Sequence, residues 1–205
     1  METVNATAGL VQPLAGLALA ALVVMGSPGP ATVSATAMGA AFGLRRSSAY
    51  VAGLILGTTA VLLAVAAGLV SLLMSQPRLA PVLLWLSVAY IVYLAVRIAM
   101  APPLPDESRA GAAPSLAGGL LLAVANPKAY VAIAAVYAGT RLAGLPPLAE
   151  AGVKIAVLTA MIVVIHVAWL VAGASFARLL RHPVAARVIN IAFALLLLAT
   201  VAVGL

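Results

Sequence analysis

The chain has 205 residues, of which 65% are hydrophobic and only 7% are charged. A water-soluble domain carries roughly 25% charged residues, so this composition excludes a soluble domain and predicts an integral protein of the lipid bilayer. The net charge of +7 does not indicate nucleic acid as a partner, because the Lys and Arg residues are spread over short loops. The chain has no cysteine, which excludes disulfides and Cys-based metal sites.

The first apolar segment, Leu10–Leu44, is longer than the roughly 20 residues that cross a bilayer, and Gly-Ser-Pro-Gly-Pro interrupts it. We interpret it as a first span and not as a cleaved signal peptide, because the N-terminus carries Glu2 and no positive charge. Arg45 and Arg46 follow this segment and end it.

The interruption, Ser27-Pro28-Gly29-Pro30, contains two prolines and a glycine, which cannot continue a regular helix. We expect the chain to unwind here and to restart as a half-helix near Ala31. The first amides of a helix have no partner within it, and together with the helix dipole they favour an anion such as a carboxylate. The alternative is a simple proline kink.

Charged and Pro-rich stretches divide the rest of the chain into five further spans, which gives six in total. They lie at about Ala49–Met74, Pro81–Ala99, Leu116–Gly139, Val153–Ala177 and Val188–Leu205. The whole chain, 1–205, is expected to form one transmembrane domain in which 101–114 is the linker. If the first interruption were a full hairpin, the count would be seven.

A second break, Asn126-Pro127-Lys128, lies in the middle of the fourth span. Proline ends the preceding helix, and an ammonium at this depth is costly unless it has a function. The alternative is that Lys128 extends to the membrane surface. No Asp or Glu lies within a predicted span, so we expect Lys128 either to be neutral at rest or to pair with the carboxylate of a substrate.

Each half of the chain therefore consists of one broken span followed by two intact spans. The first repeat covers about 8–100 and the second about 115–205. Three is an odd number, so the second half enters the membrane from the opposite side. The prediction is an all-α membrane protein of six helices arranged as two inverted repeats, the layout of many secondary transporters.

Positive residues predict the orientation, because cytoplasmic loops carry an excess of Lys and Arg. Seven of these residues follow the first, third and fifth spans, and three follow the second and fourth spans. The first group is expected inside the cell, which places both termini outside. The larger group is Arg45, Arg46, Arg97, Arg109, Arg178, Arg181 and Arg187, and the smaller is Arg78, Arg141 and Lys154.

Glycines recur four positions apart in the first two spans, a spacing that lets helix backbones approach closely. The pairs are Gly39 with Gly43 and Gly53 with Gly57. We expect these glycines to pack spans 1 and 2 against each other, and the same stripes could serve a homodimer.

Two further polar residues are candidates for substrate contact. Thr58 follows the glycine stripe and could face a cavity, and His166 lies inside the fifth span. In lipid, a His is either a proton relay, a substrate contact or a core residue with its hydrogen bonds satisfied. Trp169, one turn further, is interpreted as an interface or packing aromatic.

The absence of carboxylates and thiols within the spans predicts no metal site and no cofactor. No set of nucleophile, base and acid suggests an enzyme. The centre that remains is electropositive and suits a solute that carries a carboxylate.

These motifs resemble the LysE/RhtB family of amino-acid exporters. The matching stretches are Gly26–Leu69, Trp85–Ile98, Gly118–Ile133 and Arg178–Leu198. The resemblance implies a transporter of the bacterial inner membrane that exports amino acids or their relatives, driven by the proton gradient. It also implies that the residues of function are Pro28, Gly29, Pro30, Asn126, Pro127 and Lys128.

One departure from the family pattern bears on the substrate. Many members have an acidic residue after the second glycine pair, where this chain has Thr58. A neutral or anionic amino acid is therefore expected in place of lysine or arginine. The alternatives are an exporter of another small organic or inorganic ion and a membrane scaffold without transport.

Overall fold

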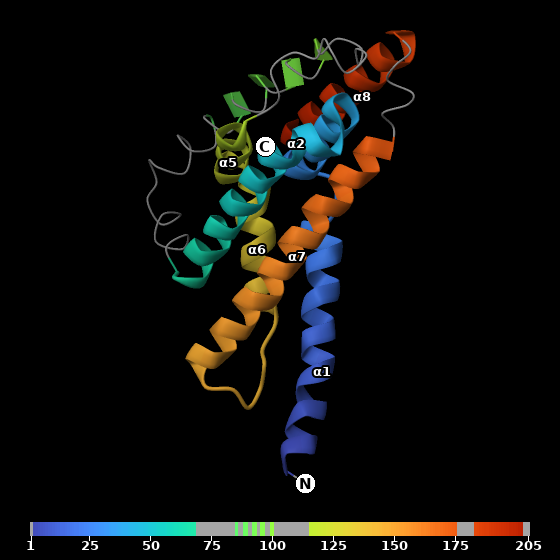
Figure 1. Cartoon of the computed structure of the whole chain (residues 1–205). Helices are drawn as coiled ribbons and strands as arrows, with labels where there is room; N and C mark the ends of the chain where they lie inside the picture. Colours follow the sequence, from blue (N-terminus) through green and yellow to red (C-terminus); the bar gives the residue numbers. More distant parts are fainter. Residues whose placement is uncertain are drawn as a thin grey trace.

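The computed structural model describes residues 2–68, 115–175 and 183–202, together with isolated positions between 85 and 100. Within these ranges every regular element is a helix, and the helices form one elongated bundle (Figure 1). The prediction of an all-α protein is therefore confirmed for the described part of the chain. The third predicted span and the linker 101–114 lie largely or wholly outside it.

The N-terminal helix α1, Glu2–Ala20, begins before the apolar segment that starts at Leu10. It continues into a π-helical turn, η1, Ala21–Met25, after which the helical conformation ends. Hydropathy marks only the part of a helix that lipid can cover, whereas the helix itself can extend into water. This difference explains why the observed start is earlier than the predicted one.

Helix α2, Pro30–Ala66, contains both the second half of the predicted first span and most of the predicted second span. The separation expected at Arg45 and Arg46 is a local bend at Gly43, where φ is +74° and ψ is 174°. Residues with a side chain rarely adopt this conformation. A Cβ at Gly43 would meet nothing within 4 Å, so its assignment to helix packing is wrong and its role is the bend.

The fourth predicted span consists of two helices, α5, Leu116–Ala125, and α6, Pro127–Gly139. Their axes differ in direction by 64°. Ser115 begins α5, because its hydroxyl accepts a hydrogen bond from the Gly118 amide at 3.1 Å. Asn126 separates the two helices in an extended conformation, and Pro127 supplies the fixed φ that suits a first helical residue.

Helix α7, Pro147–Ser175, begins six residues before the predicted Val153, because Pro147 starts it and Glu150 stabilises its first turn. Lys154, which the sequence places among the loop charges, lies in this helix and pairs with Glu150 at 2.7 Å. The Lys154 ammonium also donates to the Tyr137 carbonyl at the end of α6. A helix with an unpaired charge is costly to place in lipid, whereas a charge that is paired is tolerated there.

The last helix, α8, Pro183–Ala202, starts earlier than the predicted Val188. Its Phe193 packs against Ala40, near the bend of α2. In Figure 1, α8 lies at the end of the bundle opposite to the start of α1.

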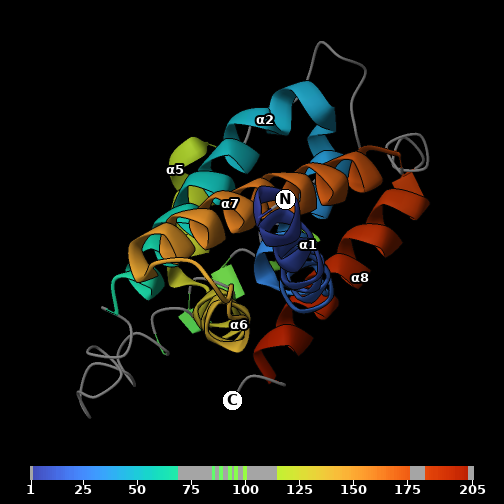
Figure 2. The ribbon, with the colours of Figure 1, turned by 90° about the horizontal axis from the view of Figure 1, so that it is seen from below.

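Helix α2 is the centre of the bundle, with α5 and α7 packed along it. Figure 2 shows α7 running between α2 and the pair formed by α1 and α6. One apolar cluster surrounds Leu54 and Leu122, and a second surrounds Ile133 and Leu158. Each break lies next to one of these clusters. Ala31, after the first break, belongs to the first cluster, and Ala129, after the second break, belongs to the second.

Three of the four predicted packing glycines lie against neighbouring helices, although not against the predicted partner. A Cβ at Gly39 would collide with the Leu170 carbonyl of α7, and Cβ atoms at Gly53 and Gly57 would collide with α5. The expectation that they join spans 1 and 2 is therefore wrong. Because these glycines are covered within the chain, they supply no argument for a homodimer.

The described helices include two, α2 and α7, that are long and apolar enough to cross a membrane, and the bent pair α5 and α6 would make a third crossing. The 37 residues of α2 exceed the roughly 20 that one crossing needs. The bend at Gly43 leaves the stretch 44–66 at a suitable length. The count of six spans includes segments outside the described ranges and stays a prediction.

Replacing Gly43 by alanine should lower the free energy of unfolding by about 1–3 kcal/mol, because a Cβ is strained at this φ and ψ. Thermal unfolding of the purified protein in detergent measures the change. Gly152→Ala is the control, since a Cβ there meets nothing within 4 Å and alanine favours a helix. Equal stability of the Gly43 variant and the wild type would show that the bend does not depend on glycine.

Candidate functional site

The two breaks meet at the side chain of Lys128, in the first turn of α6. Its ammonium donates to the Ser27 carbonyl at 2.5 Å, to the Ser27 hydroxyl at 2.8 Å and to the Pro28 carbonyl at 3.0 Å. An ammonium has three N–H donors, so all three are used. The sequence predicts that Lys128 is either neutral at rest or paired with a substrate carboxylate. The structure supplies oxygens of the other break, about 100 residues earlier in the sequence.

Prolines in a helix leave carbonyls without an amide donor, and side chains take the place of those amides here. Pro28 and Pro30 have no N–H, so the carbonyls four residues earlier, those of Val24 and Gly26, lose their helical partners. The Ser27 hydroxyl donates to the Val24 carbonyl at 2.9 Å, and the Trp169 indole donates to the Gly26 carbonyl at 3.0 Å. The break is thus held in place by α7 as well as by α6.

The first amides of the two half-helices are partly satisfied within the chain. The Thr32 hydroxyl accepts a hydrogen bond from the Gly29 amide at 2.9 Å, and the Asn126 side chain accepts one from the Lys128 amide at 3.2 Å. The sequence predicts that these amides are free for an anion. The helix dipoles still place the positive ends of α2 and α6 at the same location.

Gly29 allows Lys128 to reach the first break. A Cβ at Gly29 would lie 2.6 Å from the Lys128 Cδ and 2.9 Å from its Nζ. Any larger residue would therefore displace the Lys128 side chain from the oxygens that it contacts. The φ of Gly29 is −170°, an extended conformation open to any residue, so the requirement for glycine is one of space.

A cavity of about 40 Å³ lies between α2, α6 and α7, next to Lys128. This is room for about three water molecules. Much of its wall is apolar, and its polar side chains come from Thr32, Thr58, Asn126, Lys128 and His166. Two polar atoms of this wall, the Thr58 hydroxyl and the His166 Nε2, are buried without a hydrogen-bond partner.

A cavity at the junction of two broken apolar helices, lined by a lysine, is an arrangement found in membrane transporters. The sequence profile of the family described as LysE type translocator matches residues 22–205. The chain belongs to the LysE type translocator family. The resemblance seen in the sequence is confirmed, and the protein is a transporter and not an enzyme.

Relatives of this LysE type translocator include the cysteine/O-acetylserine efflux protein of Escherichia coli strain K12. The two are 34% identical over 181 residues, which cover 86% of this chain and 89% of the relative. The protein of the same name from E. coli O139:H28 is 34% identical over 182 residues, with the same coverage. No solved structure matches the chain.

The structure brings together most of the residues that the sequence singles out in this translocator. Ser27 and Pro28 hold Lys128, while Pro30 and Pro127 begin the two half-helices. The remaining predicted contact residues line the cavity. These are Gly29, Thr58, Asn126, Lys128 and His166.

Sequence reasoning missed two residues of the site. Thr32 caps the start of α2, and its position three residues after Gly29 is the spacing of a capping residue. Trp169 was interpreted as an interface or packing aromatic, but its indole N–H bonds the first break. Only the missing amide of Pro30 could have indicated that the Gly26 carbonyl needs a donor.

Replacing Trp169 by phenylalanine should lower the free energy of unfolding of this translocator by about 1 kcal/mol, because the Gly26 carbonyl loses its donor. Trp85→Phe is the control, since Trp85 is exposed. Chemical unfolding of the two variants in detergent gives the comparison. If both lose the same stability, the indole bond does not hold the break.

Proposed function

We propose that this chain exports small amino acids, or close derivatives of them, from the cytoplasm through the cavity between the two breaks. One observation carries the proposal: an ammonium and the positive ends of two helices converge on a cavity in a translocator. Helix N-termini and ammonium groups favour carboxylates. Every amino acid brings a carboxylate, which is the group that such an electropositive site attracts.

The lining of the cavity supports a neutral or anionic substrate. No Asp or Glu is among its described lining residues, so a lysine or arginine side chain would find no opposite charge there. The relatives are named for cysteine and O-acetylserine, which are small neutral amino acids.

Substrate entry would compete with the contacts of Lys128. Its three N–H donors already bind oxygens of Ser27 and Pro28. A carboxylate can therefore accept a hydrogen bond from Lys128 only if one of these existing hydrogen bonds breaks. A carboxylate carries a full charge and forms stronger hydrogen bonds with an ammonium than a neutral carbonyl does. Binding of the solute would therefore loosen the link between the first break and α6.

Proton-driven export is the corresponding proposal for the energy source. Lys128 and His166 are the ionisable side chains among the described lining residues. Either group could take up a proton after the solute has left and release it on the opposite side. Such alternation couples the solute to the proton gradient without a cofactor.

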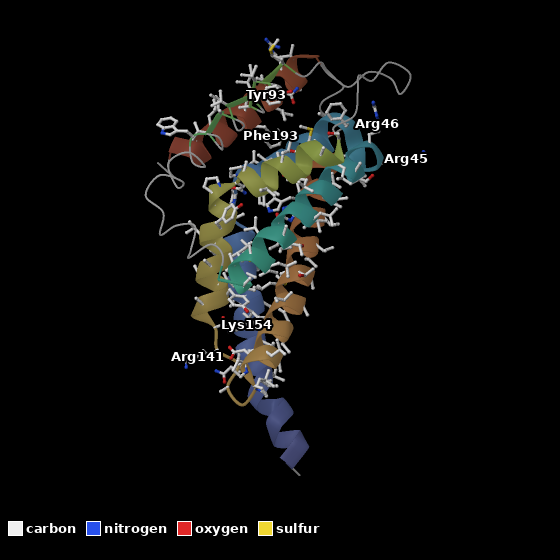
Figure 3. All side chains as sticks on the ribbon, turned by 90° about the vertical axis from the view of Figure 1, so that its left-hand side faces the viewer. Arg45, Arg46, Tyr93, Arg141, Lys154 and Phe193 are labelled. Atoms are coloured by element: carbon white, nitrogen blue, oxygen red, sulfur yellow. The ribbon has the colours of Figure 1, made fainter. Side chains whose placement is uncertain are left out.

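The orientation proposal places the bend at Gly43 in the cytoplasm, with the start of α1 outside, in the inner membrane. Figure 3 shows Arg45 and Arg46 at one end of the bundle and Arg141 and Lys154 towards the other. The sequence carries more Lys and Arg in the loops assigned to the first of these ends than in those assigned to the second, and this excess supports the orientation.

An inverted repeat is likewise proposed for the two halves. Each half contains a helix interrupted at a proline, and the two interruptions lie against each other through Lys128. Sites at the interface of two repeats are typical of secondary transporters.

Replacing Lys128 by methionine should lower amino-acid transport about ten- to a hundredfold, because the charged hydrogen-bond donor at the cavity is lost. Counterflow of radiolabelled amino acids in proteoliposomes measures it, beginning with cysteine and O-acetylserine. Arg141→Met is the control, since Arg141 lies in an exposed loop away from the cavity. The proposal fails if the wild type moves no amino acid or if the Lys128 variant transports as fast as the control.

Single-cysteine variants at Arg45 and Arg141 should react with a membrane-impermeant thiol reagent from opposite sides. The chain has no cysteine of its own, so each label reports one position. In intact cells freed of their outer membrane, position 141 should be labelled at once and position 45 only after lysis. The reverse pattern would invert the proposed orientation.

A further inference from the structure

Two unpartnered polar atoms lie on the wall of the cavity. The Thr58 hydroxyl of α2 and the Nε2 of His166 in α7 have no hydrogen-bond partner, and the exposed fractions of these residues are only 5% and 4%. Buried polar atoms are nearly always hydrogen-bonded, so each exception calls for an explanation. Two exceptions on one cavity point to a ligand that supplies the missing partner.

The hydrogen-bond role of His166 follows from its other nitrogen. The Nδ1 of His166 lies 2.7 Å from the Ile162 carbonyl, and a carbonyl oxygen can only accept. The hydrogen therefore resides on Nδ1, and in the neutral ring Nε2 is a bare acceptor. The Thr58 hydroxyl can accept as well. This part of the wall thus calls for a group with several N–H or O–H donors.

The other polar part of the wall has the opposite character. Lys128 and the N-termini of α2 and α6 supply positive charge there. The cavity therefore has one electropositive side and one side of hydrogen-bond acceptors. An α-amino acid matches this pattern, because it carries a carboxylate and an ammonium on adjacent atoms.

We propose that Thr58 and His166 bind the protonated amino group of the exported solute, while its carboxylate faces Lys128 and the helix starts. The inference rests on the proposed function and adds to it that the α-ammonium is a required feature of the substrate. An ammonium offers three donors, enough for both acceptors. A carboxylic acid without the amino group would leave both unpaired, and such sites reject the deficient analogue strongly.

The test compares cysteine with 3-mercaptopropionate, which is cysteine without its amino group. Binding of radiolabelled cysteine to the purified protein, kept under reductant, is measured in competition with each compound. The wild type should prefer cysteine by at least about a hundredfold. Thr58→Val and His166→Phe should each reduce this preference at least about tenfold, and His166→Gln, which can offer an acceptor, should restore part of it.

Thr36→Val is the matched control. Thr36 is a buried threonine of α2 whose hydroxyl bonds the carbonyls of Thr32 and Trp169, so its loss should leave the preference unchanged. Measuring a ratio of two ligands separates binding from general loss of fold. The inference is overturned if the wild type binds both compounds equally, or if the Thr58 and His166 variants keep the full preference. Failure of the wild type to bind any amino acid would overturn the proposed function itself.

Discussion

Backbone polar groups inside a membrane have no water to bond, and this constraint shapes the whole centre of the protein. Three prolines interrupt the helices at the two breaks and remove amides that the helices would use. Donors from elsewhere replace them: the indole of Trp169, the hydroxyl of Ser27 and the ammonium of Lys128. Two of these donors come from other helices, α7 and α6, so the first break fixes the positions of its neighbours.

The same constraint explains why a charged side chain is stable at this depth. The ammonium of Lys128 is surrounded by oxygens and not by a carboxylate, so its charge is solvated without being neutralised. A neutralised pair would have little attraction for an anion. An ammonium that is bound by carbonyl oxygens keeps its positive electrostatic potential. The absence of a side chain at Gly29 lets this ammonium lie next to the cavity.

The sequence could predict which residues form the site, because prolines and a charge within apolar segments are conspicuous. It could also predict the family. It could not predict the partner of Lys128, since a backbone carbonyl is present at every residue and has no signature in sequence. The role of Trp169 and the bend at Gly43 were missed for a related reason. Each depends on a contact or a dihedral angle that the chain adopts only after distant helices have packed.

The bend at Gly43 also has a consequence for how the protein enters the membrane. The two parts of α2 meet at a basic bend, because Arg45 and Arg46 come just after Gly43. This bend is synthesised before the second half of the chain. A basic bend that cannot easily cross the bilayer would fix the orientation before the second half exists. The later segments then insert into the membrane in the orientation that the first segments have already adopted.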